Sequence, residues 1–305
     1  MSAATETPAP EPKAAPSKGR VFARRLASTL VLWGVTAGTF IFASPWIFFV
    51  IVTGLTLLGL VEYFRLFHEA GLRRYRRLAY GVALIYMAAQ FAPLLGCPAE
   101  WLSSNDSAAV AALLILIVLT RIWRPLEGKR TLDEIAATVF GFAYIAPLLG
   151  FVPKILHLRL VNESGAPSAP FYILYVVAVT KFTDMGAYAI GSLIGKHKMV
   201  PHVSPGKTWQ GFGGAIFGAF VASFGSLALF GEKIPLISPI HAAVLAVALA
   251  VVAVLGDLAE SILKRSLEAK DSGHGLPGIG GVLDLIDSVL FTAPVLYVYL
   301  LIVLG

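Results

Sequence analysis

Acidic and basic residues gather in the last third of the chain, inside stretches that are otherwise apolar. Asp257, Ser261 and Lys264 are spaced i, i+4 and i+7, so a helix would place them on one stripe, with Glu260 at its border. Lys264 and Arg265 could simply extend from a helix end to water. Asp257 lies deeper, after a long run without a charged side chain, and a charge at such a depth indicates a functional site.

A second pair of carboxylates opens the next apolar run. Asp284 and Asp287 are three residues apart, and the Gly/Pro-rich segment 277–281 precedes them. Such a turn can bring the two apolar runs together, so that Asp257 and Asp284 meet. Two carboxylates repel each other unless a cation lies between them, and oxygen ligands suit Mg²⁺. The sequence therefore predicts Asp257 and Asp284 as Mg²⁺ ligands, with Asp287 as a further ligand or a partner of the ligands.

Basic residues surround this predicted metal site. Lys264, Arg265 and Lys270 follow Asp257, and Lys207 lies in a second Gly- and Pro-containing loop at 195–211. A metal ion, cations and glycine-rich backbone together favour polyphosphate binding. The residues alone therefore predict a metal-dependent site for a phosphorylated ligand.

Lys181 and Asp184 form a further charged pair, three residues apart within an apolar run. Charge inside a span is expensive and points to function. A structural ion pair that neutralises itself is the alternative.

The composition predicts an all-α integral membrane protein. Of the 305 residues, 57% are hydrophobic and only 14% are charged, and the mean hydropathy is +0.78. A membrane-spanning helix needs about 20 mostly apolar residues. Residues 1–20 are expected to form a disordered cytoplasmic tail and residues 21–305 one polytopic domain, with the active site within about 180–290. The nine predicted spans are 25–43, 45–64, 78–96, 106–123, 134–153, 170–194, 211–230, 240–263 and 284–304.

The distribution of basic residues predicts the orientation of these spans. With the N-terminus inside, 20 of the 24 Lys and Arg residues fall in inside segments and three in outside segments. This follows the positive-inside rule and predicts a cytoplasmic N-terminus and an outside C-terminus. The net charge of +6 then indicates loops that face anionic lipid rather than a nucleic-acid-binding protein. The expected location is the inner (cytoplasmic) membrane.

The last third of the chain resembles the phosphatidate cytidylyltransferases (CDP-diacylglycerol synthases). The similarity lies in Ser-x-x-Lys-Arg-x4-Lys-Asp-x-Gly from Ser261, followed by Pro-Gly-x-Gly-Gly-x-x-Asp-x-x-Asp from Pro277. The 195–211 loop adds Ser-Pro-x-Lys-Thr-Trp-x-Gly from Ser204. This compound spacing is far more specific than a single glycine-rich loop, and it covers about residues 180–305.

The resemblance implies the reaction CTP + phosphatidate → CDP-diacylglycerol + pyrophosphate, with Mg²⁺ as cofactor and a homodimer as a possible assembly. Asp257 and Asp284 would then hold the metal, and Lys264 and Arg265 would hold phosphate oxygens with the help of Ser261. The remaining predicted substrate-binding residues are Ser204, Lys207, Lys270, Asp271, Asp287 and Asp184.

Three positions depart from the family pattern. Many members have His at Ile279, Arg at Leu285 and Glu at Gln210. None of these changes removes a predicted metal ligand. Two other functions stay open at this point: a related CTP-dependent enzyme acting on another phospholipid or a polyprenol, and a membrane transporter.

Overall fold

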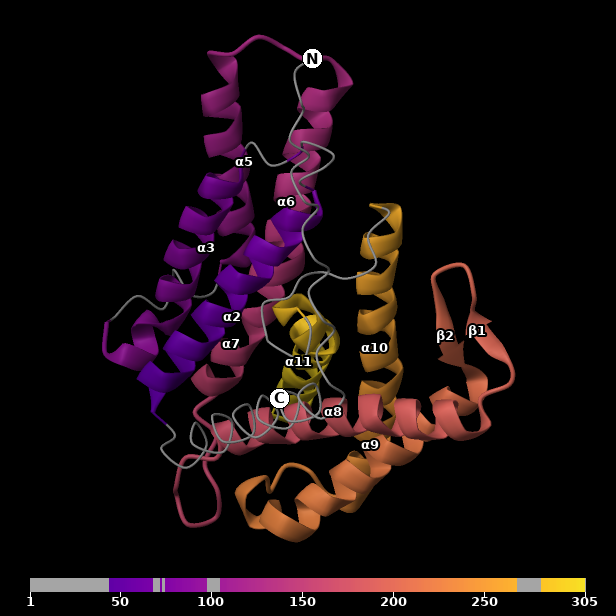
Figure 1. Ribbon diagram of the computed structural model, residues 1–305. Coiled ribbons are helices and arrows are strands. Elements are labelled where there is room, and N and C mark those ends of the chain that lie inside the picture. Colours follow the sequence, from indigo (N-terminus) through magenta and orange to yellow (C-terminus); the bar gives the residue numbers. More distant parts are fainter. Residues whose placement is uncertain (1–43, 68–71, 73–74, 98–104, 268–280, 305) are drawn as a thin grey trace, which may run out of the picture.

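The protein is helical, with one small β-hairpin (Figure 1). The computed structural model describes residues 44–67, 72, 75–97, 105–267 and 281–304. The α-helices in these ranges are α2 (Pro45–Leu66), α3 (Arg76–Phe91), α5 (Asp106–Ile122), α6 (Lys129–Leu149), α7 (Phe151–His157), α8 (Ala169–Ile194), α9 (Trp209–Phe230), α10 (Pro239–Ser266) and α11 (Val282–Leu304). The short 3₁₀ helices are η1 (Ala92–Leu95) and η2 (Gly231–Lys233), and the antiparallel strands are β1 (Lys198–Val200) and β2 (Ser204–Thr208).

Seven helical segments of the described chain are long and apolar enough to cross a membrane, which confirms a polytopic membrane protein. They are Pro45–Leu66, Arg76–Leu95, Lys129–His157, Ala169–Ile194, Trp209–Lys233, Pro239–Ser266 and Val282–Leu304. Seven of the nine predicted spans correspond to them. The predicted span 25–43 lies outside the described residues, and the predicted span 106–123 is the 17-residue helix α5. The count of nine and the orientation stay predictions.

Ser-Pro pairs begin two of these helices. Pro45 and Pro239 occupy the first turns of α2 and α10, where a missing backbone N–H costs no helical hydrogen bond. Ser238 also accepts a hydrogen bond from the His241 backbone N–H at 3.4 Å. The predicted span 45–64 therefore begins where α2 begins, at Pro45.

The helices form two groups that meet at α11 (Figure 1). Helices α2, α3, α5 and α6 pack side by side as an N-terminal bundle. Helix α8 lies along α9, and both pack on α10; α8 crosses the direction of α10 steeply in Figure 1. Helix α11 contacts α10 and α8 on one side and α2 and α6 on the other. The start of α11 is thus fixed by both groups.

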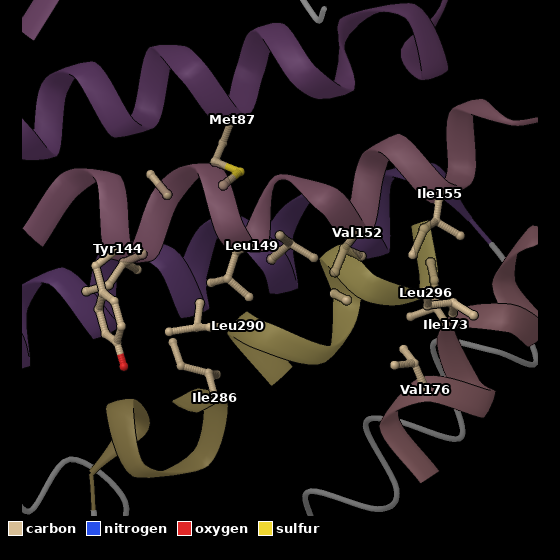
Figure 2. Packing of buried hydrophobic residues seen from close by; sticks show 14 of the residues in the cluster. Met87, Tyr144, Leu149, Val152, Ile155, Ile173, Val176, Ile286, Leu290 and Leu296 are labelled. Atoms are coloured by element: carbon tan, nitrogen blue, oxygen red, sulfur yellow. The ribbon is translucent and has the colours of Figure 1, made fainter. Parts of the chain in front are cut away.

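Apolar side chains fill the space between α11 and its neighbours (Figure 2). Leu149 of α6 and Leu290 of α11 are almost fully buried, as is Leu296 further along α11. Ile173 and Val176 of α8 complete this contact. Because close packing resists displacement, the core holds α11 in a defined position relative to α6 and α8.

Helices α8 and α9 approach each other backbone to backbone. A Cβ atom added at Gly218 of α9 would lie 2.2 Å from the Phe182 carbonyl oxygen of α8. A Cβ atom at Gly186 would lie 2.2 Å from the Gly214 carbonyl oxygen. Small residues allow such close contacts between membrane helices, where dispersion and polar contacts replace the hydrophobic effect.

This contact predicts unequal effects of two alanine substitutions in α9. Gly218→Ala must displace backbone and should destabilise the protein by about 1–3 kcal/mol, the usual cost of overpacking. Gly213→Ala is the matched control, because nothing lies within 4 Å of its added Cβ. Thermal unfolding of the purified variants in detergent measures the difference, and equal melting temperatures would contradict the close approach.

Candidate active site

A cavity of about 580 Å³ opens between the hairpin and four helices, α8, α9, α10 and α11. Its volume falls within the range of small-ligand sites. The lining comes from four separate parts of the sequence, yet its charged residues all lie between Asp184 and Asp287.

The hairpin forms one wall and is tied to the start of α9. The Thr208 hydroxyl accepts a hydrogen bond from the Gly211 backbone N–H at 3.1 Å, which caps α9. The side-chain amide oxygen Oε1 of Gln210 accepts hydrogen bonds from the backbone N–H groups of Lys196 and His197 at 3.2 and 3.1 Å. Gln210, one of the three departures, thus anchors the loop that leads into β1.

Lys207 links the hairpin to α10. Its Nζ lies 2.8 Å from Asp257 Oδ2 and donates to the Val254 carbonyl oxygen at 3.1 Å. The predicted proximity of a loop lysine to a carboxylate within the apolar run is therefore present in the structure.

Lys264 connects α10 with α11. Its Nζ lies 3.1 Å from Glu260 Oε2, one helical turn earlier, and 2.5 Å from Asp284 Oδ1. The three side chains are half-buried or buried, so each charge depends on the others for stabilisation.

Two carboxylates accept hydrogen bonds from backbone N–H groups at the N-terminus of α11. Asp284 Oδ2 accepts from the Gly281 backbone N–H at 2.9 Å, in the manner of a capping box. Glu62 of α2, which is buried, accepts from the Leu283 backbone N–H at 2.8 Å. Negative charge is favourable at the positive end of a helix dipole. These contacts hold the first turn of α11 in the position at which Asp284 and Asp287 line the cavity.

Three carboxylates converge at the base of the cavity. Asp257, Glu260 and Asp287 each offer an oxygen, and these oxygens lie within 4.8 Å of one another. Glu260 Oε1 is buried and has no hydrogen-bond partner among the described residues. A buried carboxylate oxygen without a donor is costly unless something else binds it. Clustered carboxylate oxygens are the donor set that suits Mg²⁺, so these residues fit the predicted cofactor.

Most of the predicted site residues lie in this cavity. The predicted residues that line it are Asp184, Ser204, Lys207, Asp257, Lys264, Asp284 and Asp287. Both carboxylate oxygens of Asp284, a predicted metal ligand, accept hydrogen bonds, one from Lys264 Nζ and one from the Gly281 backbone N–H. The carboxylates that cluster with Asp257 are those of Glu260 and Asp287.

Two predicted residues lie off the cavity lining. Ser261 is half-buried on α10, and Arg265 is exposed. Lys270 and Asp271 lie outside the described residues, as does the departure Ile279. The third departure, Leu285, contributes its backbone carbonyl oxygen, which accepts from Lys181 Nζ at 2.8 Å.

The structure adds residues from the N-terminal bundle that the sequence patterns did not indicate. Tyr144 of α6 is buried near Glu260 and Asp287, and within the described part of the chain its hydroxyl has no hydrogen-bond partner. Figure 2 shows its hydroxyl on the side of Ile286. The signal that could have revealed Glu62 is its position, since it is an acid within the predicted span 45–64.

Most of the chain is similar to one group of enzymes. The model of the Cytidylyltransferase family matches residues 23–303. The phosphatidate cytidylyltransferase of Mycobacterium leprae is 30% identical over 307 residues, covering 94% of this chain and 90% of that protein. The enzyme of the same name from Bacillus subtilis is 35% identical, over 65% of this chain and 69% of that protein. That from Staphylococcus haemolyticus is 41% identical, over 66% and 72%.

Glu62 should prove essential for the position of α11, although it does not line the cavity. We expect Glu62→Ala to destabilise the protein by about 2 kcal/mol, the size of a buried hydrogen bond to a charged group. Glu62→Gln keeps an acceptor oxygen and should lie between wild type and Glu62→Ala. Thermal unfolding in detergent measures these effects, with the exposed Glu163→Ala as control. A Glu62→Ala variant as stable as Glu163→Ala would contradict the capping role.

Proposed function

The chain belongs to the cytidylyltransferase family, and we propose that it transfers the cytidylyl group of CTP to phosphatidate, forming CDP-diacylglycerol and pyrophosphate in phospholipid biosynthesis. The observation that carries this function is the cavity. In it, Lys207 of the hairpin and Lys264 of α10 line the same space as a cluster of three carboxylates. Several relatives that cover most of this chain bear the name of this activity.

Mg²⁺ is proposed as the cofactor, held by Asp257, Glu260 and Asp287. Their converging oxygens and the unpartnered Glu260 Oε1 support this choice. Asp284 supports the site through Lys264 instead, which revises the ligand pair expected from sequence spacing. When bound, Mg²⁺ would neutralise charge on the triphosphate of CTP.

The side chains of the cavity position the reactants. A phosphate oxygen of phosphatidate attacks the α-phosphorus of CTP; the bond from that phosphorus to the α–β bridging oxygen breaks, and pyrophosphate leaves with the bond's electron pair. Lys207 and Lys264 supply positive charge for the triphosphate and the leaving group, and both are already held by carboxylates. Ser204, at the start of β2, offers a hydroxyl to phosphate oxygens. In phosphoryl-type transfers such positioning and charge stabilisation supply most of the catalysis.

The finer topology is also part of the proposal: nine spans in the inner membrane, with the N-terminus inside. Helix α5 has 17 residues and would reach about 25 Å, close to the minimum span. Its apolar side chains Leu114, Ile115 and Leu119 are exposed, as expected for contact with lipid. The homodimer implied by the resemblance is a further prediction, which native mass spectrometry from detergent tests.

CTP labelled at the α-phosphate tests the reaction. We expect Mg²⁺-dependent transfer of the label to phosphatidate and its loss with EDTA. Asp257→Asn, Glu260→Gln and Asp284→Asn should each lower the rate by about a hundredfold or more, as loss of a charge-stabilising group commonly does. The control is Glu232→Gln, because Glu232 is exposed in η2, which follows α9 and lies away from the cavity lining.

Three outcomes would contradict parts of this proposal. If Asp257→Asn and Glu260→Gln fold normally and keep wild-type activity, the metal assignment is wrong. Transfer to a polyprenyl phosphate in preference to phosphatidate would identify a related CTP-dependent enzyme. Solute flux into proteoliposomes without nucleotide would identify a transporter.

Cys97, the single cysteine, tests the orientation. It is exposed and follows η1, at the start of the segment between the predicted spans 78–96 and 106–123, which the proposed topology places outside. A membrane-impermeant maleimide should therefore label it in intact spheroplasts. A cysteine moved to the predicted inside loop, in the double variant Cys97→Ser, Arg124→Cys, should react only after permeabilisation. The reverse pattern would invert the topology.

A further inference from the structure

Lys181 is a cation within the membrane-spanning helix α8 that does not belong to the cavity lining. Its side chain is 24% exposed. Its Nζ lies 3.4 Å from Asp184 Oδ2 and donates to the Leu285 carbonyl oxygen of α11 at 2.8 Å. A lysine within a membrane-spanning helix costs free energy, so we expect its charge to stabilise a neighbouring group of opposite charge.

Hydrogen bonds lead from Lys181 to the carboxylate cluster. Asp184, its ion-pair partner, lines the cavity, and its Oδ1 accepts from the Ser288 hydroxyl at 3.5 Å. The backbone N–H of the same Ser288 donates to Asp287 Oδ1 at 2.5 Å, and its hydroxyl oxygen lies 3.1 Å from that atom, so that the two aspartates share one hydroxyl hydrogen. Asp287 is one of the three clustered carboxylates. Lys181 is therefore connected to the carboxylate cluster through Asp184 and Ser288.

The charges around the cavity show what this lysine does. The described lining carries five carboxylates, whereas Lys207 and Lys264 are its two lysines. Lys207 pairs with Asp257, and Lys264 pairs with Glu260 and Asp284. With Lys181 counted and all eight groups ionised, two negative charges are left, which one divalent cation cancels. Without Lys181, three are left.

We propose that Lys181 is a built-in counter-cation that sets the affinity of the cavity for a divalent cation and limits the positive charge that the cavity takes up from solution. This role deepens the proposed function, since it assumes that the cavity binds a divalent cation. Lys181 does not line the cavity, so it is a positioning residue. Its effect is electrostatic, and the sign of that effect separates it from a structural role.

Mn²⁺ binding to the full-length protein in detergent, measured by electron paramagnetic resonance without nucleotide or lipid, tests the proposal. Lys181→Met leaves the cluster more negative and should lower the Kd for Mn²⁺ by more than about tenfold, because at an effective dielectric constant of about 20 a unit charge within about 20 Å changes the affinity for a divalent cation by at least that factor. Asp184→Asn should raise the Kd. The double variant removes both charges and should return the Kd close to that of wild type, in a double-mutant cycle.

Two further variants serve as controls. Lys181→Arg keeps the charge and should keep the wild-type Kd. Lys154→Met removes another half-buried lysine, which pairs with Asp106 away from the cavity, and should also keep it. A purely structural Lys181 predicts a raised Kd in Lys181→Met and no recovery in the double variant. That result, or an unchanged Kd, would overturn the proposal.

The same experiment separates this inference from the proposed reaction. A wild-type protein that makes CDP-diacylglycerol but binds no Mn²⁺ overturns the counter-cation role and leaves the transfer intact. A protein that shows the expected shifts in Kd but makes no CDP-diacylglycerol supports the role of Lys181 and overturns the transfer.

Discussion

The site depends on one constraint: a charged side chain in a membrane domain needs an opposite charge or a polar backbone group beside it. Lys264 meets this requirement twice, through Glu260 on its own helix and Asp284 on the next. Removing one member of such a set leaves an uncompensated charge, which costs about 3–5 kcal/mol in buried pairs. The charges therefore hold α10 and α11 together as well as lining the cavity.

The same constraint explains why backbone groups take part in the site. Lys181 and Lys207 each donate to a carbonyl oxygen as well as approaching a carboxylate. The two carbonyls belong to Leu285 on α11 and Val254 on α10. Each lysine therefore joins two segments of the chain, and its charge is stabilised before any substrate arrives. Preorganised charge of this kind is what a transfer between phosphates requires.

Helical spacing predicted much of the site, because residues three, four and seven apart share a face. Asp257 and Lys264 were placed together in this way, and both line the cavity. Spacing placed Ser261 on this stripe and Glu260 only at its border, although at about 100° per residue the two residues lie on either side of Asp257. The packing of α10 against α9 and α11 decides the choice, and it places Glu260 in the cavity. Such tertiary contacts leave no periodic signal in the sequence.

The position of Glu62 within an apolar span marks it as unusual, but no local pattern shows which helix the N-terminal bundle contacts. The motifs that resemble the family lie in the last 125 residues or so, yet Glu62 caps α11 across a separation of 221 residues. Tyr144 of α6 also contacts α11, where its ring lies edge-on to that of Phe291. The family match over residues 23–303 agrees with this arrangement, since it covers both groups of helices. The positions of the carboxylates therefore depend also on helices that carry none of the motif.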